Sequence, residues 1–425
     1  MSAAVHADLS DSNLTLAHGS GRGLGMALIV AGALCALATA GAAFSGAGGI
    51  SLKQWLAAYH VGAMSVLAMC LGSLFFIMAF HLTNAGWASA IRRQFENVAS
   101  FLPFAFLLVL PTLLIEVLTH GKLFLWLSHD MAGDPLLEHK KVFFYLNQPI
   151  GGLPVFFVIR AVLYAVIWTY LSRRLCKLSR LQDESGDVAL SAQARRTSAW
   201  GMLVFALSVA FASFDWLMSM DFKFFSTMWG VYYFSGAAFS AAGLVAIVLA
   251  RLVGAGKLKG VVTSEHFHDL GKLMFSFTVF WAYIAFFQYF LIWYSNIPEE
   301  TAFYVYRNNE PWKSMGVFLM LGHFVVPFLI LLFRPVKKSP AALTVMGLWA
   351  IVVQVVDIYW VVRPMVHATE DHAPPLTPTL WLDVIAILGP LLVLAGYLFV
   401  RVSASCLVAR RDPWMPEALA HRNYV

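Results

Sequence analysis

Charged residues are scarce in this sequence. Asp, Glu, Lys and Arg make up 12% of its 425 residues, whereas 60% are hydrophobic. Soluble proteins carry about twice that share of charge, so the composition excludes a soluble globule and a disordered chain. With a mean hydropathy of +0.72, the chain is expected to divide into membrane spans instead of soluble domains.

Cysteines are also few, and their spacing does not suggest a cofactor site. None lies in a CxxC or CxxCH pattern, which argues against zinc, iron–sulfur and covalent haem sites. The four are Cys35, Cys70, Cys176 and Cys406. A membrane b-type haem is disfavoured because only His323 lies deep within a span, while His60 and His81 lie near opposite edges. No nucleotide-binding or serine-protease motif stands out, which argues against a self-contained enzyme.

Long apolar runs fill most of the sequence instead. Ten windows are apolar over about 20 residues, the length that crosses a bilayer as a helix. We therefore predict an all-α polytopic membrane protein with ten transmembrane helices, in which a membrane domain at 24–403 lies between tails at 1–23 and 404–425. The predicted spans lie near 24–45, 55–82, 98–119, 153–173, 198–221, 225–252, 268–296, 313–334, 341–363 and 380–403. The longest connections, 120–152, 174–197 and 297–312, are too short for a separate catalytic domain.

The distribution of basic residues predicts the orientation. Ten spans place both termini on one side. That side carries twenty of the 29 lysines and arginines, including Arg92 and Arg93 in a loop, against eight on the other side, including Arg363 in a loop. Positive loops stay inside, so both termini are expected in the cytoplasm. Because this charge is dispersed over many short loops, the pI near 9.1 does not indicate nucleic-acid binding.

Four charged residues lie clearly at membrane depth within the predicted spans, in their outer third. They are Glu116, Arg160, Asp215 and Asp357. A charge at this depth costs about 2.5–3.5 kcal/mol on insertion scales, so each needs a partner or a function. One interpretation is a structural ion pair of Arg160 with Asp215 or Glu116. The other is proton exchange, because three acids and one arginine leave at least one carboxyl without a cationic partner from this set.

A second polar group opens the predicted seventh span. His268 and Lys272 are four residues apart and share a helical face, whereas His266 and His268 do not, which disfavours a metal pair. The alternatives are a helix cap at Asp269, with Lys272 reaching the interface, or a proton entrance. His323 lies between the two polar zones and is either a proton relay or a core histidine.

Matching acids suggest a weak internal repeat. The fifth span ends in Phe214-Asp215-Trp216 and the ninth in Val356-Asp357-Ile358-Tyr359-Trp360, four helices later. This predicts two successive four-helix bundles, spans 2–5 and 6–9, with spans 1 and 10 outside them.

Several motifs carry a family resemblance over roughly residues 24–400. They are Ser213-Phe214-Asp215-Trp216, Trp229-Gly230-Val231-Tyr232, His268-Asp269-Leu270-Gly271-Lys272, Trp293-Tyr294-Ser295-Asn296-Ile297-Pro298-Glu299-Glu300 and Gly322-His323-Phe324. In these motifs the chain resembles the ActF-type subunits of alternative complex III, which are NrfD-like membrane proteins. The resemblance implies a subunit of a quinol:cytochrome c or related electron-acceptor oxidoreductase of the bacterial inner membrane.

The resemblance also implies cofactors and partners. The chain is expected to bind no redox cofactor directly, although a quinone is compatible with its fold. Haem c and iron–sulfur clusters would lie in partners: a sister ActC-like subunit that binds quinol, a periplasmic iron–sulfur subunit and c-type cytochromes, all within membrane lipid. The implied proton-path residues are Asp215, Asp357, His323, His268 and Asp269, to which Glu116 and Arg160 are added for their depth and Lys272 for its place beside His268.

Two other classes of function remain open from the sequence. A secondary transporter also has ten or more spans with polar residues at depth, but it usually has interrupted helices at matching positions in two halves, and no convincing pair is evident here. A purely structural anchor for peripheral enzymes would not require three acids near one face of the membrane.

Overall fold

The computed structural model describes residues 7–17, 19–46, 51–128, 133–145, 153–367 and 380–423, and the parts of the predicted tails and of the 120–152 connection outside these ranges are not described. Ten helical segments are long and apolar enough to cross a membrane. They are α2 (Arg22–Ser45), α3 (Leu52–Leu82), α4 (Arg92–Ala99) with α5 (Leu102–Leu118), α7 (Val155–Ser185), α8 (Val188–Trp216), α9 (Trp229–Gly254), α10 (Ser264–Ser295), α12 (Trp312–Leu319) with α13 (Val326–Leu332), α15 (Pro340–Val362) and α16 (Leu380–Ser403). The predicted all-α fold with ten spans is confirmed.

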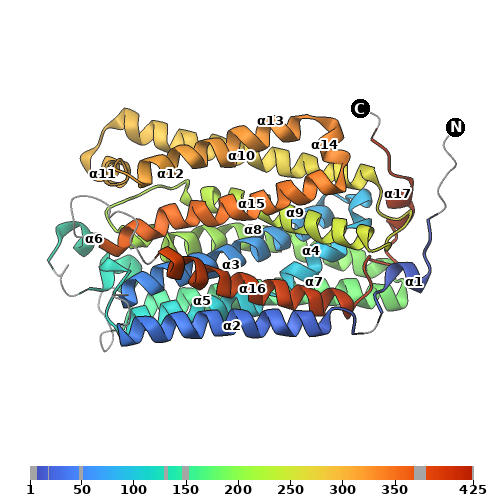
Figure 1. Cartoon of the computed structure of the whole chain (residues 1–425), viewed down its shortest axis with the longest axis horizontal. Helices are drawn as coiled ribbons and strands as arrows, with labels where there is room; N and C mark the ends of the chain where they lie inside the picture. The colour runs from blue at the N-terminus through green and yellow to red at the C-terminus, as the bar shows by residue number, and fades with distance from the viewer. Residues whose placement is uncertain are drawn as a thin grey trace.

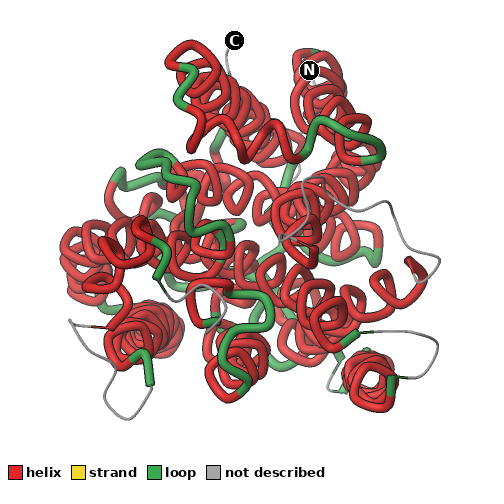
Figure 2. The backbone as a smooth tube through the Cα atoms, turned by 90° about the vertical axis from the view of Figure 1, so that its left-hand side faces the viewer, coloured by secondary structure: helices red, strands yellow, loops and turns green. Residues whose placement is uncertain are grey.

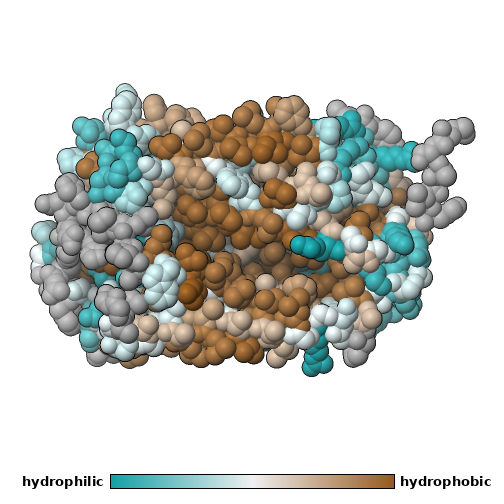
Figure 3. All heavy atoms as spheres, viewed as in Figure 1, coloured by the Kyte–Doolittle hydropathy of each residue, from teal (hydrophilic) through white to brown (hydrophobic). Residues whose placement is uncertain are grey.

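The spans run along the long axis of the molecule (Figure 1). Five short helices lie at its two ends: α1 (Asp11–Leu14), α14 (Arg334–Lys338) and α17 (Met415–Ala420) at one, and α6 (Pro135–Tyr145) and α11 (Pro298–Tyr306) at the other. We call the first the terminal end, because both chain termini lie there, and the second the opposite end. Figure 3 shows apolar side chains around the middle and polar ones at both ends, as expected for a multi-pass membrane protein.

Helix α3 is the most buried span of the bundle, which Figure 2 shows end-on. Within its most apolar window 89% of the residues are buried, compared with 17% in α2. It packs against α9, α16, α8, α5 and α15. Among the other spans, α7 packs against α8 and α5, α10 and α15 pack against α9, α12 contacts α15, and α13 contacts α10. The large contacts of α3 with α9 and α16 cross the predicted division into two bundles.

The first and last spans, α2 and α16, pack against each other beside α3. Their contact is made through glycines. A Cβ atom on Gly32 would lie 2.5 Å from the carbonyl oxygen of Gly389, and one on Gly396 would lie 2.4 Å from that of Gly25. Small residues let two helix backbones approach closely, which is a major source of helix association inside a bilayer.

Two of the predicted connections are largely helical. The predicted connection at 174–197 is wrong, because α7 continues to Ser185 and α8 begins at Val188. The last turns of α7 and the first turns of α8 extend beyond the apolar spans and are exposed to water. They carry charged residues, so hydropathy alone does not detect them. The 297–312 connection contains α11, which begins at Pro298 and has Glu299 and Glu300 in its first turn, as favoured at helix N-termini.

Candidate functional site

Asp357 lies on α15 and is buried among residues of three other spans. Its Oδ1 accepts a hydrogen bond from the Tyr232 hydroxyl, and its Oδ2 accepts one of 3.0 Å from Trp281 Nε1. His323 Nδ1 lies 3.7 Å from the same Oδ2. Among the described residues, no lysine or arginine forms an ion pair with Asp357. This carboxyl is therefore the predicted acid without a cationic partner.

His323 lies in a π-helical turn, Met320–Val325, between α12 and α13. Its ring stacks on Trp281, with 3.9 Å between the ring centroids and 17° between the planes. The side chain is fully buried, and neither ring nitrogen has a hydrogen-bond partner. A buried polar group without a partner is costly, and π-turns occur frequently at functional sites. His323 and Asp357 thus form a buried titratable pair supported by aromatic rings.

A cavity of about 620 Å³ borders this pair. Tyr232 and Trp281, the two hydrogen-bond donors to Asp357, are part of its wall. Phe286 and Met320 also line it and are 58% and 55% exposed on membrane-spanning segments, so the cavity opens toward lipid. Its other walls come from α10, α11, α12 and Trp360 of α15. The cavity is large enough for a small organic ligand.

The polar groups of this cavity lie near the opposite end. Gln288 accepts a 2.8 Å hydrogen bond from Ser226 and contacts the hydroxyl of Tyr304 at 3.5 Å. Arg307 stacks on Phe303, a wall residue, with 3.7 Å from its guanidinium carbon to the ring centroid. Burial lowers the pKa of Arg307 to about 10. Its guanidinium donates to backbone carbonyls of α11 and α15, which fixes these two helices together.

Arg160 and Asp215 form a two-contact ion pair between α7 and α8. Arg160 Nε donates to Asp215 Oδ2 at 2.8 Å and Nη2 donates to Oδ1 at 2.6 Å. The Tyr164 hydroxyl adds a third hydrogen bond of 2.8 Å to this carboxylate. Asp215 is therefore the ion-pair partner of Arg160, and Glu116 is not.

Glu116 has a separate, local role in the geometry. It is fully buried near the end of α5. Its carboxylate accepts hydrogen bonds from the backbone N–H groups of Leu123, at 2.9 and 3.0 Å, and Phe124, at 3.0 Å. These bonds hold the chain that follows α5 in a fixed turn. Glu116 is not brought together with Asp357 or His323.

A further buried pair was missed by the sequence analysis. Arg363 Nε donates to Asp383 Oδ2 at 2.8 Å, and the Tyr359 hydroxyl donates to the same oxygen at 2.8 Å. Gln54 Nε2 donates to Asp383 Oδ1 at 3.1 Å. Arg363 was counted as an outer-loop charge because it ends an apolar window. Its position within one helical turn of a span was the only available signal that it is buried.

At the terminal end, the predicted polar group forms a cluster with the chain after α16. The Asp269 carboxylate contacts Lys272 and His421, and Asn423 donates to it at 3.3 Å. His268 is buried beside this cluster, and its Nδ1 has no hydrogen-bond partner. About 18 Å of α10 separates Asp269 from Trp281. The structure does not bring this cluster together with Asp357.

The predicted helix cap at Asp269 is wrong. Helix α10 begins at Ser264, and Thr263 caps it together with the ring of His266. Asp269 lies in the second turn, where it holds the chain after α16 instead. Helix α10 starts before the apolar window because the chain after α16, and not lipid, covers its first turn.

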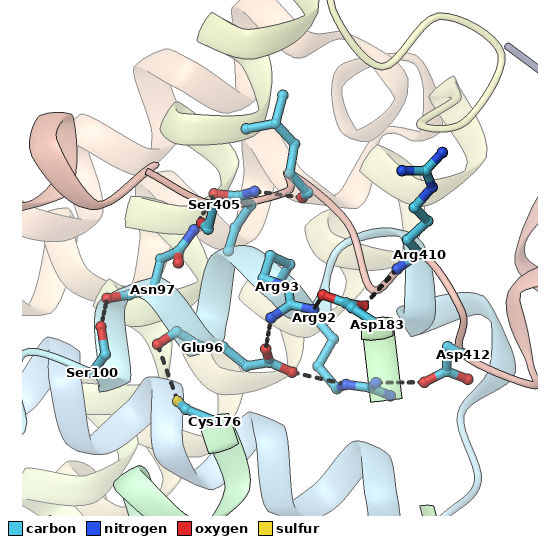
Figure 4. Close-up of polar contacts among 12 residues, drawn as sticks. Arg92, Arg93, Glu96, Asn97, Ser100, Cys176, Asp183, Ser405, Arg410 and Asp412 are labelled. Carbon is cyan, nitrogen blue, oxygen red and sulfur yellow. Dashed lines mark hydrogen bonds and ion pairs between the residues drawn. The ribbon is translucent and has the colours of Figure 1, made fainter. Parts of the chain in front are cut away.

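A second ion-pair network at the terminal end also went unrecognised (Figure 4). Glu96 pairs with both Arg92, at 3.2 Å, and Arg93, at 3.1 Å. Asp412, after α16, pairs with Arg92, while Asp183 of α7 pairs with Arg93. Both arginines are buried, although the sequence analysis counted them as loop charges. The network joins α4, α7 and the chain after α16.

No protein-family model and no curated protein matches this sequence. Within the described ranges, no three His, Cys, Asp or Glu side chains come together as a metal ion would require. The chain is a polytopic integral membrane protein.

Proposed function

We propose that this chain is the ActF-like membrane subunit of a respiratory quinol oxidoreductase of the alternative complex III type. Support comes from the residue-level resemblance over most of the membrane domain. The proposal places the protein in the bacterial inner membrane with the terminal end toward the cytoplasm, in agreement with the excess of basic residues on that side.

Within such a complex, the chain acts as a scaffold and as a site of proton exchange at Asp357 and His323. The observation that carries this role is the buried Asp357 carboxyl, which Tyr232 and Trp281 hold and with which no lysine or arginine pairs among the described residues. A carboxyl without a cationic partner changes its protonation state at lower cost than one in a buried ion pair. Asp215, which is paired with Arg160, is structural in this proposal.

The electron-transfer groups belong to partner subunits in this proposal. They are an ActC-like sister subunit that binds quinol, a periplasmic iron–sulfur subunit and c-type cytochromes. For this chain, the cavity beside Tyr232 and Trp281 is the place where a quinone would bind, since it is open to lipid and bordered by polar groups. Crosslinking of the purified complex with a photoreactive quinone analogue tests this point, because labelling confined to the sister subunit would remove quinone binding from this chain.

The first experiment is a gentle pull-down of this chain from native membranes. A native gel is stained for haem c, and the co-purifying subunits are identified by mass spectrometry. The proposal expects haem staining, an iron–sulfur subunit and a second ten-helix protein in one band. A lone, haem-free band would overturn it, and uptake assays in proteoliposomes would then test a secondary transporter. A complex whose turnover survives amide substitution of Glu116, Asp215 and Asp357 would indicate a structural anchor.

A further inference from the structure

Two cavities meet on α7 near the terminal end. One, of about 620 Å³, lies against α5 and the middle of α7, and the other, of about 330 Å³, lies between α7, the start of α5 and α16. Arg173 and Lys177 line both cavities. The two spaces therefore form one site with a shared basic centre, which we call the α7 basic site.

The α7 basic site has a strong excess of positive charge. Arg173, Lys177, Arg180 and Arg401 line its smaller cavity, where Glu184 is the single carboxylate in the wall. None of these four basic side chains forms an ion pair with a described acid. The buried Nε of Arg401 has no hydrogen-bond partner. The hydroxyls of Ser100, Ser172 and Tyr397 also line the wall, but they are already hydrogen-bonded within the protein. The four basic side chains are therefore the donors that fit the oxygens of a phosphate group.

The larger cavity supplies an apolar continuation of the same site. Phe106 of α5 and Val162, Ala165 and Val166 of α7 line it. Val162 and Val166 are more than half exposed on a membrane-spanning helix, so they face lipid chains. A ligand that fills both cavities needs an anionic phosphate head and hydrocarbon chains.

The depth of the site matches that of a lipid headgroup. Arg173 lies about 27 Å along α7 from Val155, and Arg180 lies about 38 Å along it. The hydrocarbon core is about 30 Å thick, so the basic centre coincides with the headgroup region when α7 spans the bilayer. The apolar wall lies within the hydrocarbon region on the same scale.

We propose that the α7 basic site binds an anionic phospholipid, with its phosphate between Arg173, Lys177, Arg180 and Arg401 and its acyl chains along the apolar wall on α5 and α7. The phosphate replaces the missing acidic partners of these side chains. The bound lipid then links α7 to α16 across a gap that protein side chains leave open. This proposal requires only that the chain spans a membrane and is independent of its role in a respiratory complex.

The test uses the full-length protein after delipidation in mild detergent. Native mass spectrometry measures the binding of phosphatidylglycerol, of phosphatidylcholine and of glycerol phosphate, which has the anionic head without chains. We expect tight binding of phosphatidylglycerol, weak binding of phosphatidylcholine and no comparable binding of glycerol phosphate. Equal binding of both lipids would overturn the proposal, and so would binding of glycerol phosphate as tight as that of phosphatidylglycerol.

Variants locate the binding to this site. Arg173→Gln with Lys177→Gln should weaken phosphatidylglycerol binding about thirty-fold, since each basic residue near a membrane surface contributes about 1 kcal/mol to binding anionic lipid. The matched control is Arg195→Gln with Arg196→Gln, which removes the same charge from exposed positions at the start of α8 and should change the affinity little. Equal loss in both double variants would place the effect in the general surface charge and overturn the assignment.

Val166→Trp keeps the test independent of any folding defect in the charge variant. It fills the apolar wall, where the side chain has room on the lipid-facing surface, and leaves every charge in place. We expect it to lower phosphatidylglycerol affinity with an unchanged melting temperature of the lipid-free protein. Unchanged affinity would exclude acyl chains from this cavity.

Discussion

His323 Nδ1 lies 3.7 Å from Asp357 Oδ2, which is too far for a hydrogen bond. The groups that surround the pair are neutral rings and a hydroxyl, and no other described charged side chain contacts it. The carboxylate already accepts bonds from Tyr232 and Trp281, and the imidazole nitrogens accept or donate none. A small movement of the π-helical turn would bring the two groups into contact. Substitutions at these two residues therefore best distinguish a structural role from a role in turnover.

Asp357→Asn should leave the assembled complex intact and impair its turnover. The amide keeps the shape of the carboxyl and an acceptor oxygen but cannot exchange a proton. Turnover should fall by about a hundred-fold, the lower limit for loss of a general acid–base group. Quinol oxidation by the purified complex measures it, with Asp221→Asn near the membrane edge as a control for the same chemical change. Normal turnover would remove Asp357 from any proton path.

His323→Phe should be nearly neutral for stability. The substitution keeps an aromatic ring stacked on Trp281, and the imidazole nitrogens have no hydrogen bonds to lose. His60→Phe is the contrast, because the ring of His60 makes a 2.9 Å hydrogen bond with the Trp216 carbonyl and its loss leaves a buried oxygen unsatisfied. Melting temperatures in detergent compare the two, and a larger loss at His323 would show that its ring has a structural role instead.

Separating Arg160 from Asp215 should be strongly destabilising. Removal of one partner leaves a buried charge without compensation, which costs about 3–5 kcal/mol. Arg160→Met and Asp215→Leu should therefore each lower the unfolding free energy by this amount. The combined variant should recover much of the loss, because neither charge remains. Denaturant unfolding in detergent measures all three, and additive losses would contradict the pairing.

Gly32→Val should separate α2 from α16. Its Cβ would meet the Gly389 backbone at 2.5 Å, and overpacking of this kind costs about 1–3 kcal/mol. Gly41→Val is the matched control in the same helix, since no atom lies within 4 Å of a Cβ there. The thermal stability of the two variants should differ clearly. Equal stability would mean that the close helix contact contributes little.

Much of the fold follows from the sequence because the bilayer imposes one strong requirement. An apolar helix of about 20 residues satisfies its own backbone hydrogen bonds, so hydropathy locates ten spans. Hydropathy does not detect helical turns that continue beyond the membrane into water. For this reason the end of α7 and the start of α8 were predicted as a loop. The π-helical turn at His323 also has no signature in the apolar pattern.

The candidate site was predictable in part for a similar reason. Counting charges at depth predicted that at least one of Glu116, Asp215 and Asp357 lacks a cationic partner, and it left Asp215 and Glu116 as alternative partners of Arg160. Depth fixes only one coordinate, however, so it could not indicate that Tyr232 and Trp281 hold Asp357. Nor could it place Arg363 beside Asp383, because each lies at the edge of an apolar window, where a charge normally reaches water.

The network in Figure 4 can be completed only late in the synthesis of the protein. Arg92 lies at the start of the third span, but its partner Asp412 follows the tenth. During synthesis the ribosome must therefore deliver every later span before this contact closes. Until then α4 has only Glu96 within its own segment to balance two arginines. The segment after α16, near the end of the described chain, thus completes the burial of α4, which is synthesised early.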